Sequence, residues 1–163
     1  MDKLERHSYD KIDGEWVISK TAILTYERIP YNIPMIASIQ KRLYDVLTPD
    51  LVTHKYREEN KTNPMYGHCY HTTQALYYLF DTDTLDPMMS GDWRGGTHWW
   101  LQDRETSVIL DFTVDQYLSI EKEPPHSTGK VTGWYGWKGR PHMRTLKLIQ
   151  RLQPDATIEL ISF

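Results

Sequence analysis

Apolar side chains recur at spacings of three and four residues in three stretches of the chain. Residues 36–47 show this spacing and predict an amphipathic helix that ends at the Thr48-Pro49 break, with its apolar stripe toward the core. A second helix is expected over residues 69–80, where no helix breaker interrupts the pattern. A third is expected over residues 143–152, after a proline.

Shorter runs rich in β-branched and aromatic residues predict strands. Residues 97–101 and 107–110 are expected to pair as an antiparallel hairpin. Residues 157–161 alternate in polarity and predict a closing strand. Near the N-terminus, residues 16–18 and 22–26 are two further runs, which predict a hairpin or an irregular N-terminal layer.

Polar and breaker-rich segments predict irregular connections between these elements. Residues 53–66 are expected to form a loop that leads into the second helix, and residues 81–87 an irregular segment that includes Asp86-Pro87. Residues 121–130 predict a surface loop. Residues 131–137 predict a short strand or turn interrupted by glycine.

The mixture of helices and antiparallel strands makes α+β the expected fold class. With 163 residues and no linker or internal repeat, the chain is expected to form a single domain. We divide it into an N-terminal layer over residues 1–33, a catalytic core over residues 34–117, and a loop, helix and strand over residues 118–163.

Charge and cysteine content limit the classes of function. A net charge of −3 and a pI near 6.1 argue against a general nucleic-acid binder, which usually carries a basic face. The start of the chain is charged and no run of about 18 apolar residues occurs, so neither export nor a membrane partner is expected. Since a single cysteine permits no intrachain disulfide, a cytoplasmic location is expected, that of the host if the protein is phage-encoded.

The aromatic residues carry polar atoms to an unusual degree, with 6 Trp and 11 Tyr against 3 Phe. Such side chains suit pocket walls, because one part is apolar and another forms hydrogen bonds. For any single ring, a half-buried core position is the alternative. The candidate wall residues are Trp99, Trp100, Trp134, Tyr135 and Trp137.

The order Cys69, His98, Asp111 suggests covalent catalysis. Cys69 begins the second predicted helix, where the dipole and unpaired backbone N–H groups favour a thiolate and can stabilise an oxyanion. His98, on a predicted strand, would take the thiol proton, and Asp111, just past the next strand, would orient the imidazole. Taken singly, each of the three is more often a structural residue.

Metal and nucleotide chemistry have less support. His68, Cys69, His71 and His98 include zinc-ligand types, but no Cys-x-x-Cys or His-Glu-x-x-His motif accompanies them, so no metal is expected. No phosphate loop or dinucleotide fingerprint is present, so no cofactor is expected either. A basic run in and just before the last predicted helix is expected to be solvated, with contact to an acidic partner as the alternative; its residues are Arg140, Arg144, Lys147 and Arg151.

Four segments carry a resemblance to a known family. They are Gly67-His68-Cys69-Tyr70, the run from Gln74 to Leu79, the run from Gly95 to Leu101, and the run from Leu110 to Tyr117. Together they resemble small, largely uncharacterised phage and bacterial proteins and are similar to the YunG-like proteins, which share a Gly-x-Cys helix, a His-Trp strand and an Asp-x-Thr-x-x-Gln element. The match covers roughly residues 64–117.

The order of elements also resembles papain-like and transglutaminase-like enzymes, in which a helix-borne cysteine faces a histidine and an acidic or amide residue on antiparallel strands. This resemblance implies that Cys69 is the nucleophile, His98 the base and acid, and Asp111 the orienting group. Many papain-like enzymes place a glutamine shortly before the cysteine. Here His68 or Asn63 would have to act with the Cys69 backbone N–H as oxyanion donor.

The favoured function is therefore that of a cysteine-dependent hydrolase or acyltransferase acting on an amide or related acyl bond of a peptide, a protein or a small amide. Peptidase, amidase, deamidase and transamidase activities all remain open. Gln116, in the shared Asp-x-Thr-x-x-Gln element, is a further candidate for substrate contact, with a turn-capping role as the alternative. The alternative function is that of a non-catalytic phage or bacterial effector that binds a host protein.

Overall fold

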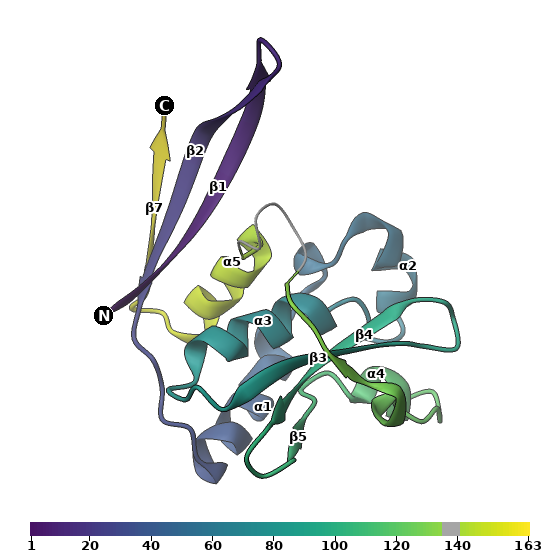
Figure 1. Ribbon diagram of the computed structural model, residues 1–163. Coiled ribbons are helices and arrows are strands. Elements are labelled where there is room, and N and C mark those ends of the chain that lie inside the picture. Colours follow the sequence, from purple (N-terminus) through teal and green to yellow (C-terminus); the bar gives the residue numbers. More distant parts are fainter. Residues whose placement is uncertain (135–140) are drawn as a thin grey trace.

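The computed structural model describes residues 1–134 and 141–163, which form an α+β fold with two antiparallel sheets and several helices (Figure 1). The first sheet has the order β1-β2-β7 and consists of β1 (Asp2–Ile12), β2 (Glu15–Tyr26) and β7 (Thr157–Ser162). The closing strand predicted near the C-terminus is thus confirmed as β7. It pairs antiparallel with β2.

A long hairpin, rather than two short runs, forms the N-terminal layer. The predicted runs at residues 16–18 and 22–26 both belong to the single strand β2, and their partner β1 lies upstream. Asp13 and Gly14 join the strands with φ values of +50° and +80°. Positive φ at both central residues is the requirement of a tight type I′ turn, whose twist matches that of the strands. The turn therefore continues the pairing out to Ile12 and Glu15.

The second sheet has the order β5-β4-β3-β6 and contains β3 (Leu85–Gly91), β4 (Thr97–Asp103), β5 (Ile109–Leu110) and β6 (Lys130–Val131). The predicted hairpin is confirmed as β4 and β5. The prediction of an irregular segment through Asp86-Pro87 is wrong, because these residues belong to β3. The Pro87 carbonyl faces β6 and accepts from Thr132 N. In a strand the N–H and C=O of one residue point to the same side, so the N–H that Pro87 lacks would also face away from β4. Pro87 is therefore tolerated, because no hydrogen bond to β4 is lost.

The three predicted helices are confirmed as α1 (Ile33–Val46), α3 (Cys69–Leu79) and α5 (Met143–Leu152). Asn32 caps α1 by accepting from Met35 N. The segments between these elements contain short helices that local periodicity does not mark. They are η1 (Pro49–Leu51), η2 (His54–Tyr56), α2 (Arg57–Asn60), α4 (Asp115–Leu118) and η3 (His126–Thr128).

The core lies around α3, which packs against α5 on one side and against β3 and β4 on the other (Figure 1). Leu76 of α3, Leu146 of α5 and Leu101 of β4 are fully buried there. Leu24 of β2 also reaches this core, so the base of the hairpin is anchored to the body. Burial of each such side chain contributes roughly 1.5–3 kcal/mol. Packing therefore fixes the position of α3 and of the residue at its start.

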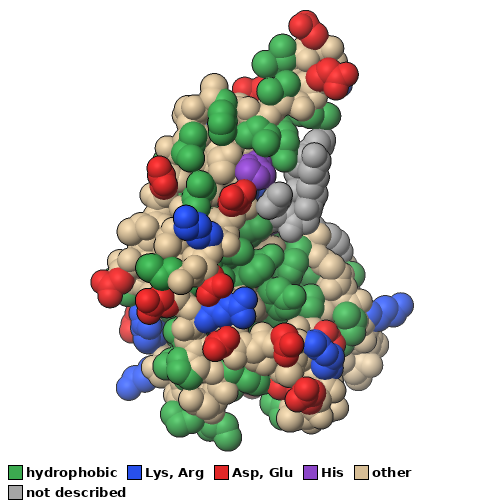
Figure 2. Space-filling model, turned by 60° about the vertical axis from the view of Figure 1, so that its left-hand side comes forward, with side chains coloured by type: hydrophobic (Ala, Val, Ile, Leu, Met, Phe, Trp, Pro, Cys, Tyr) green, Lys and Arg blue, Asp and Glu red, His purple; other side chains and the backbone are tan. Residues whose placement is uncertain are grey.

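The outer part of the β1–β2 hairpin extends away from this core. Ile12, Trp16, Val17 and Ile18 are exposed there, and Figure 2 shows hydrophobic side chains among charged ones over the projecting hairpin. In the part of the chain that the structure describes, no helix combines the length and apolar character that crossing a membrane requires.

Candidate active site

A tight turn delivers Cys69 to the start of α3. Gly67 has φ of +87°, and a Cβ on it would lie 2.7 Å from Val52 Cγ1, so both the backbone conformation and the space favour glycine. His68 follows as the N-cap residue without forming a side-chain capping bond. The first N–H groups of α3 therefore remain available beside the cysteine.

Strand β4 brings His98 next to this helix start. The Cys69 thiol donates to the carbonyl of Thr97, at a distance of 3.8 Å. The next residue, His98, is fully buried, and its Nε2 lies 2.6 Å from Asp111 Oδ2. Its ring stacks on Trp100 and meets the edge of Tyr117. The imidazole is thus held in one orientation between the acidic residue and the cysteine.

The electrostatics favour a protonated His98. Burial by itself lowers the pKa of this imidazole, but hydrogen bonds to Asp111 and Cys69, together with their negative charges, outweigh burial and raise the pKa of His98 to about 9. The ring is therefore an imidazolium at neutral pH, with a proton on each nitrogen. An imidazolium beside a thiol sulfur stabilises the thiolate, which is the nucleophilic form of cysteine.

Asp111 is shared by two histidines. Its Oδ2 accepts from His98 Nε2 and also from His126 Nε2, at 2.7 Å, and the carboxylate is almost fully buried. Burial alone would raise the pKa of Asp111, but the hydrogen bonds from His126 and His98 prevail and lower it. Sequence analysis missed His126, because its only signal is a histidine in a loop that contains two prolines.

The same three side chains have the residue types of a metal site, since one ligand atom from each lies within 4.8 Å of the others. The spacing of the atoms is that of hydrogen bonds, however, at 2.6 and 2.7 Å. Tetrahedral ligands on zinc, with bonds of about 2.0–2.1 Å, lie roughly 3.3 Å apart. In this arrangement Asp111 acts as a hydrogen-bond acceptor for the two imidazoles.

Gln116 of α4 also reaches the site. Its Nε2 lies 3.4 Å from His98 Nδ1 and 3.1 Å from Thr113 Oγ1, and the residue lines the pocket in front of Cys69. This carboxamide lies downstream of Asp111 in the sequence, and the tertiary fold brings it to the pocket that Cys69 lines.

The two other oxyanion candidates have partners elsewhere. Asn63 Nδ2 donates to the backbone carbonyl of Gln116, and Asn63 Oδ1 accepts from Ser119, so this side chain supports α4. The fully buried His68 shares a hydrogen bond of 2.8 Å with His71, and burial lowers the pKa of His68 to about 4. Neither Asn63 nor His68 is among the residues that line the pocket at Cys69.

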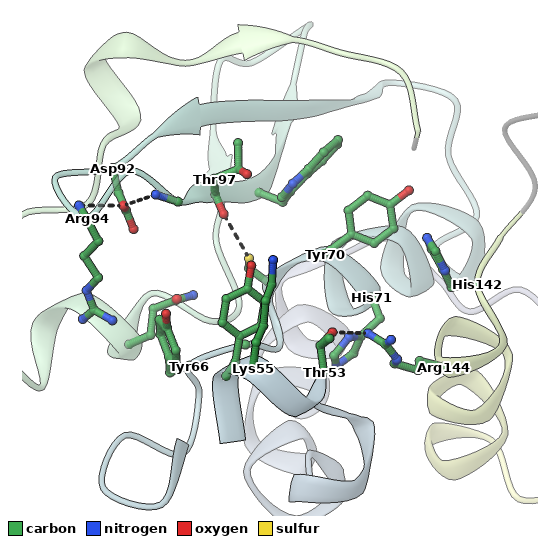
Figure 3. A pocket seen from close by; sticks show the side chains of 16 residues that line it. Thr53, Lys55, Tyr66, Tyr70, His71, Asp92, Arg94, Thr97, His142 and Arg144 are labelled. Carbon is green, nitrogen blue, oxygen red and sulfur yellow. Dashed lines mark hydrogen bonds between the residues drawn. The ribbon is translucent and has the colours of Figure 1, made fainter. Parts of the chain in front are cut away.

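Cys69 opens onto a pocket of about 340 Å³ with aromatic walls (Figure 3). Trp99 and Tyr70 form one wall, with ring centroids 4.7 Å apart, and Trp134 stacks behind Trp99. Trp100 lies instead in the interior, where it is 1% exposed and its ring stacks on that of His98. The other two aromatic candidates, Tyr135 and Trp137, lie outside the described residues.

Fold and site together define an α+β protein in which a helix-borne cysteine faces a histidine that is hydrogen-bonded to a buried aspartate, at the edge of an apolar pocket. Comparisons with protein-family models, with curated proteins and with solved structures found no match for this chain.

Proposed function

We propose that the protein is a cysteine-dependent hydrolase or acyltransferase that acts on an amide or related acyl bond, with a papain-like arrangement of Cys69, His98 and Asp111. The observation that carries this proposal is the His98 imidazole, which bonds through Nε2 to a buried carboxylate and interacts with the pocket-lining Cys69. Nucleophile, base and orienting group are thereby each present once.

In the first half of the reaction, the Cys69 thiolate attacks the carbonyl carbon, the S–C bond forms, and the π electrons move onto the carbonyl oxygen. The protonated His98 then donates its Nδ1 proton to the leaving nitrogen as the C–N bond breaks, which leaves a thioester on Cys69. In the second half, His98 takes a proton from water, the resulting hydroxide forms a C–O bond, and the S–C bond breaks to regenerate the thiolate. An amine in place of water gives acyl transfer.

Two groups are placed to stabilise the oxyanion. The backbone N–H of Cys69 lies in the first turn of α3, and the carboxamide of Gln116 lines the same pocket. Such donors act best when they are fixed before the charge develops, and removal of one typically costs about 100-fold to 1,000-fold in rate. The hydrogen bond that Gln116 Nε2 donates to Thr113 Oγ1 holds the carboxamide in place.

The order of elements supports the same proposal. Cys69 begins a helix, His98 lies on a strand that packs against that helix, and Asp111 directly follows the next antiparallel strand. This is the order on which the resemblance to papain-like enzymes rests. The resemblance to YunG-like proteins depends on the same segments and stays a prediction.

The proposal is tested by the reactivity of the thiol. Cys69 is the only cysteine, so iodoacetamide labelling followed by intact mass reports on it alone. We expect fast labelling at pH 6, and labelling about 100-fold slower in His98→Ala, because an ordinary thiol is mostly protonated at that pH. His54→Ala, at an exposed histidine outside the site, should label like the wild type.

A second measurement follows the covalent intermediate. An activated ester should leave an acyl group on Cys69 that is detectable by mass, and the Asp111→Ala variant should accumulate it more slowly. A wild-type protein that labels at pH 6 no faster than free cysteine, and that forms no acyl adduct, would refute the enzyme proposal. That outcome would favour the alternative of a non-catalytic effector that binds a host protein.

A further inference from the structure

The two ends of the pocket differ in charge. At one end Arg94 forms an ion pair with Glu59, and Asp92 accepts from the Tyr117 hydroxyl and from backbone N–H groups (Figure 3). The Arg94 charge is therefore paired with a carboxylate, and Asp92 accepts several hydrogen bonds, although Arg94 Nε has no hydrogen-bond partner among the described residues.

The opposite end carries Arg144, from the first turn of α5. Lys55, from η2, lines the pocket between this end and Tyr66 (Figure 3). The Arg144 guanidinium donates to Thr53 Oγ1 at 2.8 Å, which fixes its direction beside the pocket (Figure 3). Among the described residues, neither Arg144 nor Lys55 lies within ion-pair distance of a carboxylate. Arg151 on the same helix differs, because it pairs with Asp50.

The uncapped N-terminus of α5 adds positive potential at this end, through its free backbone N–H groups. His142, the N-cap residue of α5, also lines the pocket, and no side chain caps the helix. Burial lowers the pKa of His142, and the nearby charges of Arg6 and Arg144 lower it further. Arg6 likewise has no ion pair among the described residues. Cations that repel one another without a counterion form a site that an anion would stabilise.

We propose that this end of the pocket binds an anionic group of the substrate, a carboxylate or a phosphate, while the acyl carbon lies at Cys69. The inference rests on the proposed function and deepens it, because it names the substrate class: an amide or acyl compound with an acidic end. A guanidinium held by a hydroxyl is preorganised for two parallel hydrogen bonds to such a group.

The wall between the two positions suits the rest of that substrate. Tyr70 lines the pocket with Cys69 and packs edge-on to His142, with ring centroids 5.1 Å apart. Trp99 and Tyr56 add further aromatic surface to the lining. A short apolar chain between the scissile bond and the acidic group would therefore contact rings along its length.

The test measures binding separately from reactivity. In full-length Cys69→Ser, calorimetry compares ε-acetamidocaproate with its neutral primary amide. We expect the acid to bind about tenfold more tightly, since hydrogen bonds between charged groups are the strong ones. Arg144→Gln should remove this preference, and Arg144→Lys should retain part of it. Lys147→Gln, at an exposed position on the same helix, is the matched control and should keep it.

Equal affinity for the two compounds, including no measurable binding of either, overturns the proposal, as does a preference that survives in Arg144→Gln.

A reactive pair of compounds separates this inference from the proposed function. ε-Chloroacetamidocaproate and its primary amide both alkylate Cys69 in the wild-type protein. Rapid alkylation by both compounds at equal rates would contradict the anion site and leave the cysteine enzyme standing. A tenfold preference in binding without rapid alkylation would support the anion site and refute the catalytic thiol. Acetamidopentyl phosphate in the binding assay distinguishes a phosphate from a carboxylate as the preferred group.

Discussion

The two ring nitrogens of His98 face different partners. Nε2 donates to Asp111 Oδ2, and the other side of the ring lies toward Cys69 and Gln116. A buried imidazole without these partners would be neutral, whereas here the pKa of His98 is raised to about 9. The fold thus holds a protonated imidazole beside Cys69 at neutral pH.

The raised pKa of His98 links folding stability to pH. Since this pKa rises from 6.5 to about 9 on folding, the protonated ring contributes stability that is fully present below pH 6.5 and is lost as the pH rises through about 9. We expect the unfolding free energy of the wild type to fall by roughly 3 kcal/mol over this range, relative to His98→Gln. Urea titrations from pH 6 to pH 10 measure the difference, and parallel curves for the two proteins would contradict it.

His126 acts as a positioning residue, because it touches Asp111 and not the sulfur. His126→Ala removes one of two donors to a buried carboxylate, so Asp111 can turn and release His98. We expect iodoacetamide labelling of Cys69 to slow roughly tenfold, because small displacements of a group beside the reacting atom lower the rate. His126→Gln can still donate an N–H and should restore most of the rate. If Ala and Gln label alike, His126 has no such role.

At the scale of elements, the site depends on how closely the end of η3 approaches the Trp100 side chain of β4. Gly129 follows η3 directly, and a Cβ on it would lie 2.3 Å from the Trp100 ring. Because this ring is buried and supports His98, glycine at residue 129 lets η3 bring His126 to Asp111. A larger side chain at residue 129 is therefore expected to destabilise the protein.

Gly129→Ala should destabilise the protein by about 2 kcal/mol, because overpacking forces a rigid ring or the backbone to move. Thermal unfolding measures the loss, and labelling of Cys69 should slow as well, since the Trp100 ring stacks on His98. Gly133→Ala is the control, because a Cβ there meets no atom of the described residues within 4 Å. Equal unfolding temperatures for the two variants would contradict the packing argument.

The elements also show what local sequence can and cannot predict. The three long helices and the β4–β5 hairpin were predicted because their apolar spacing is regular over several turns or residues. Strand β3 was missed because proline usually interrupts a strand. Pro87 is tolerated only because the N–H that it lacks would face away from β4, and that depends on the pairing of the strands. The Asp13-Gly14 turn carries a signal in the sequence that would have located the hairpin correctly.

On the scale of the whole molecule, the β1–β2 hairpin belongs to the core only at its base. Leu24 is fully buried against the body, whereas Trp16 near the turn is 52% exposed. The projecting end is therefore expected to contribute little to folding or to the site. Two substitutions in β2, one at the base and one near the turn, compare the contributions of these parts to stability.

Leu24→Ala should cost about 3 kcal/mol of unfolding free energy, because it leaves a cavity in the core. Trp16→Ser should change that free energy by less than about 0.5 kcal/mol, as surface substitutions usually do. Chemical denaturation measures both, and Cys69 labelling should stay at the wild-type rate in Trp16→Ser. A large loss of stability in Trp16→Ser would show that the hairpin end packs against other parts of the protein.

The sequence by itself determined the types and order of the central residues and the helix that carries Cys69, because these depend on residue chemistry and on periodicity along a few turns. The tertiary structure alone decided that His126 shares Asp111 and that Gln116 reaches the pocket. It likewise placed Arg144 at one end of the pocket, where no carboxylate of the described residues pairs with it. These residues come from short helices, helix ends and loops, whose positions are fixed by packing between distant segments. A sequence pattern records spacing along the chain, whereas the site depends on distances between side chains that only the folded core brings together.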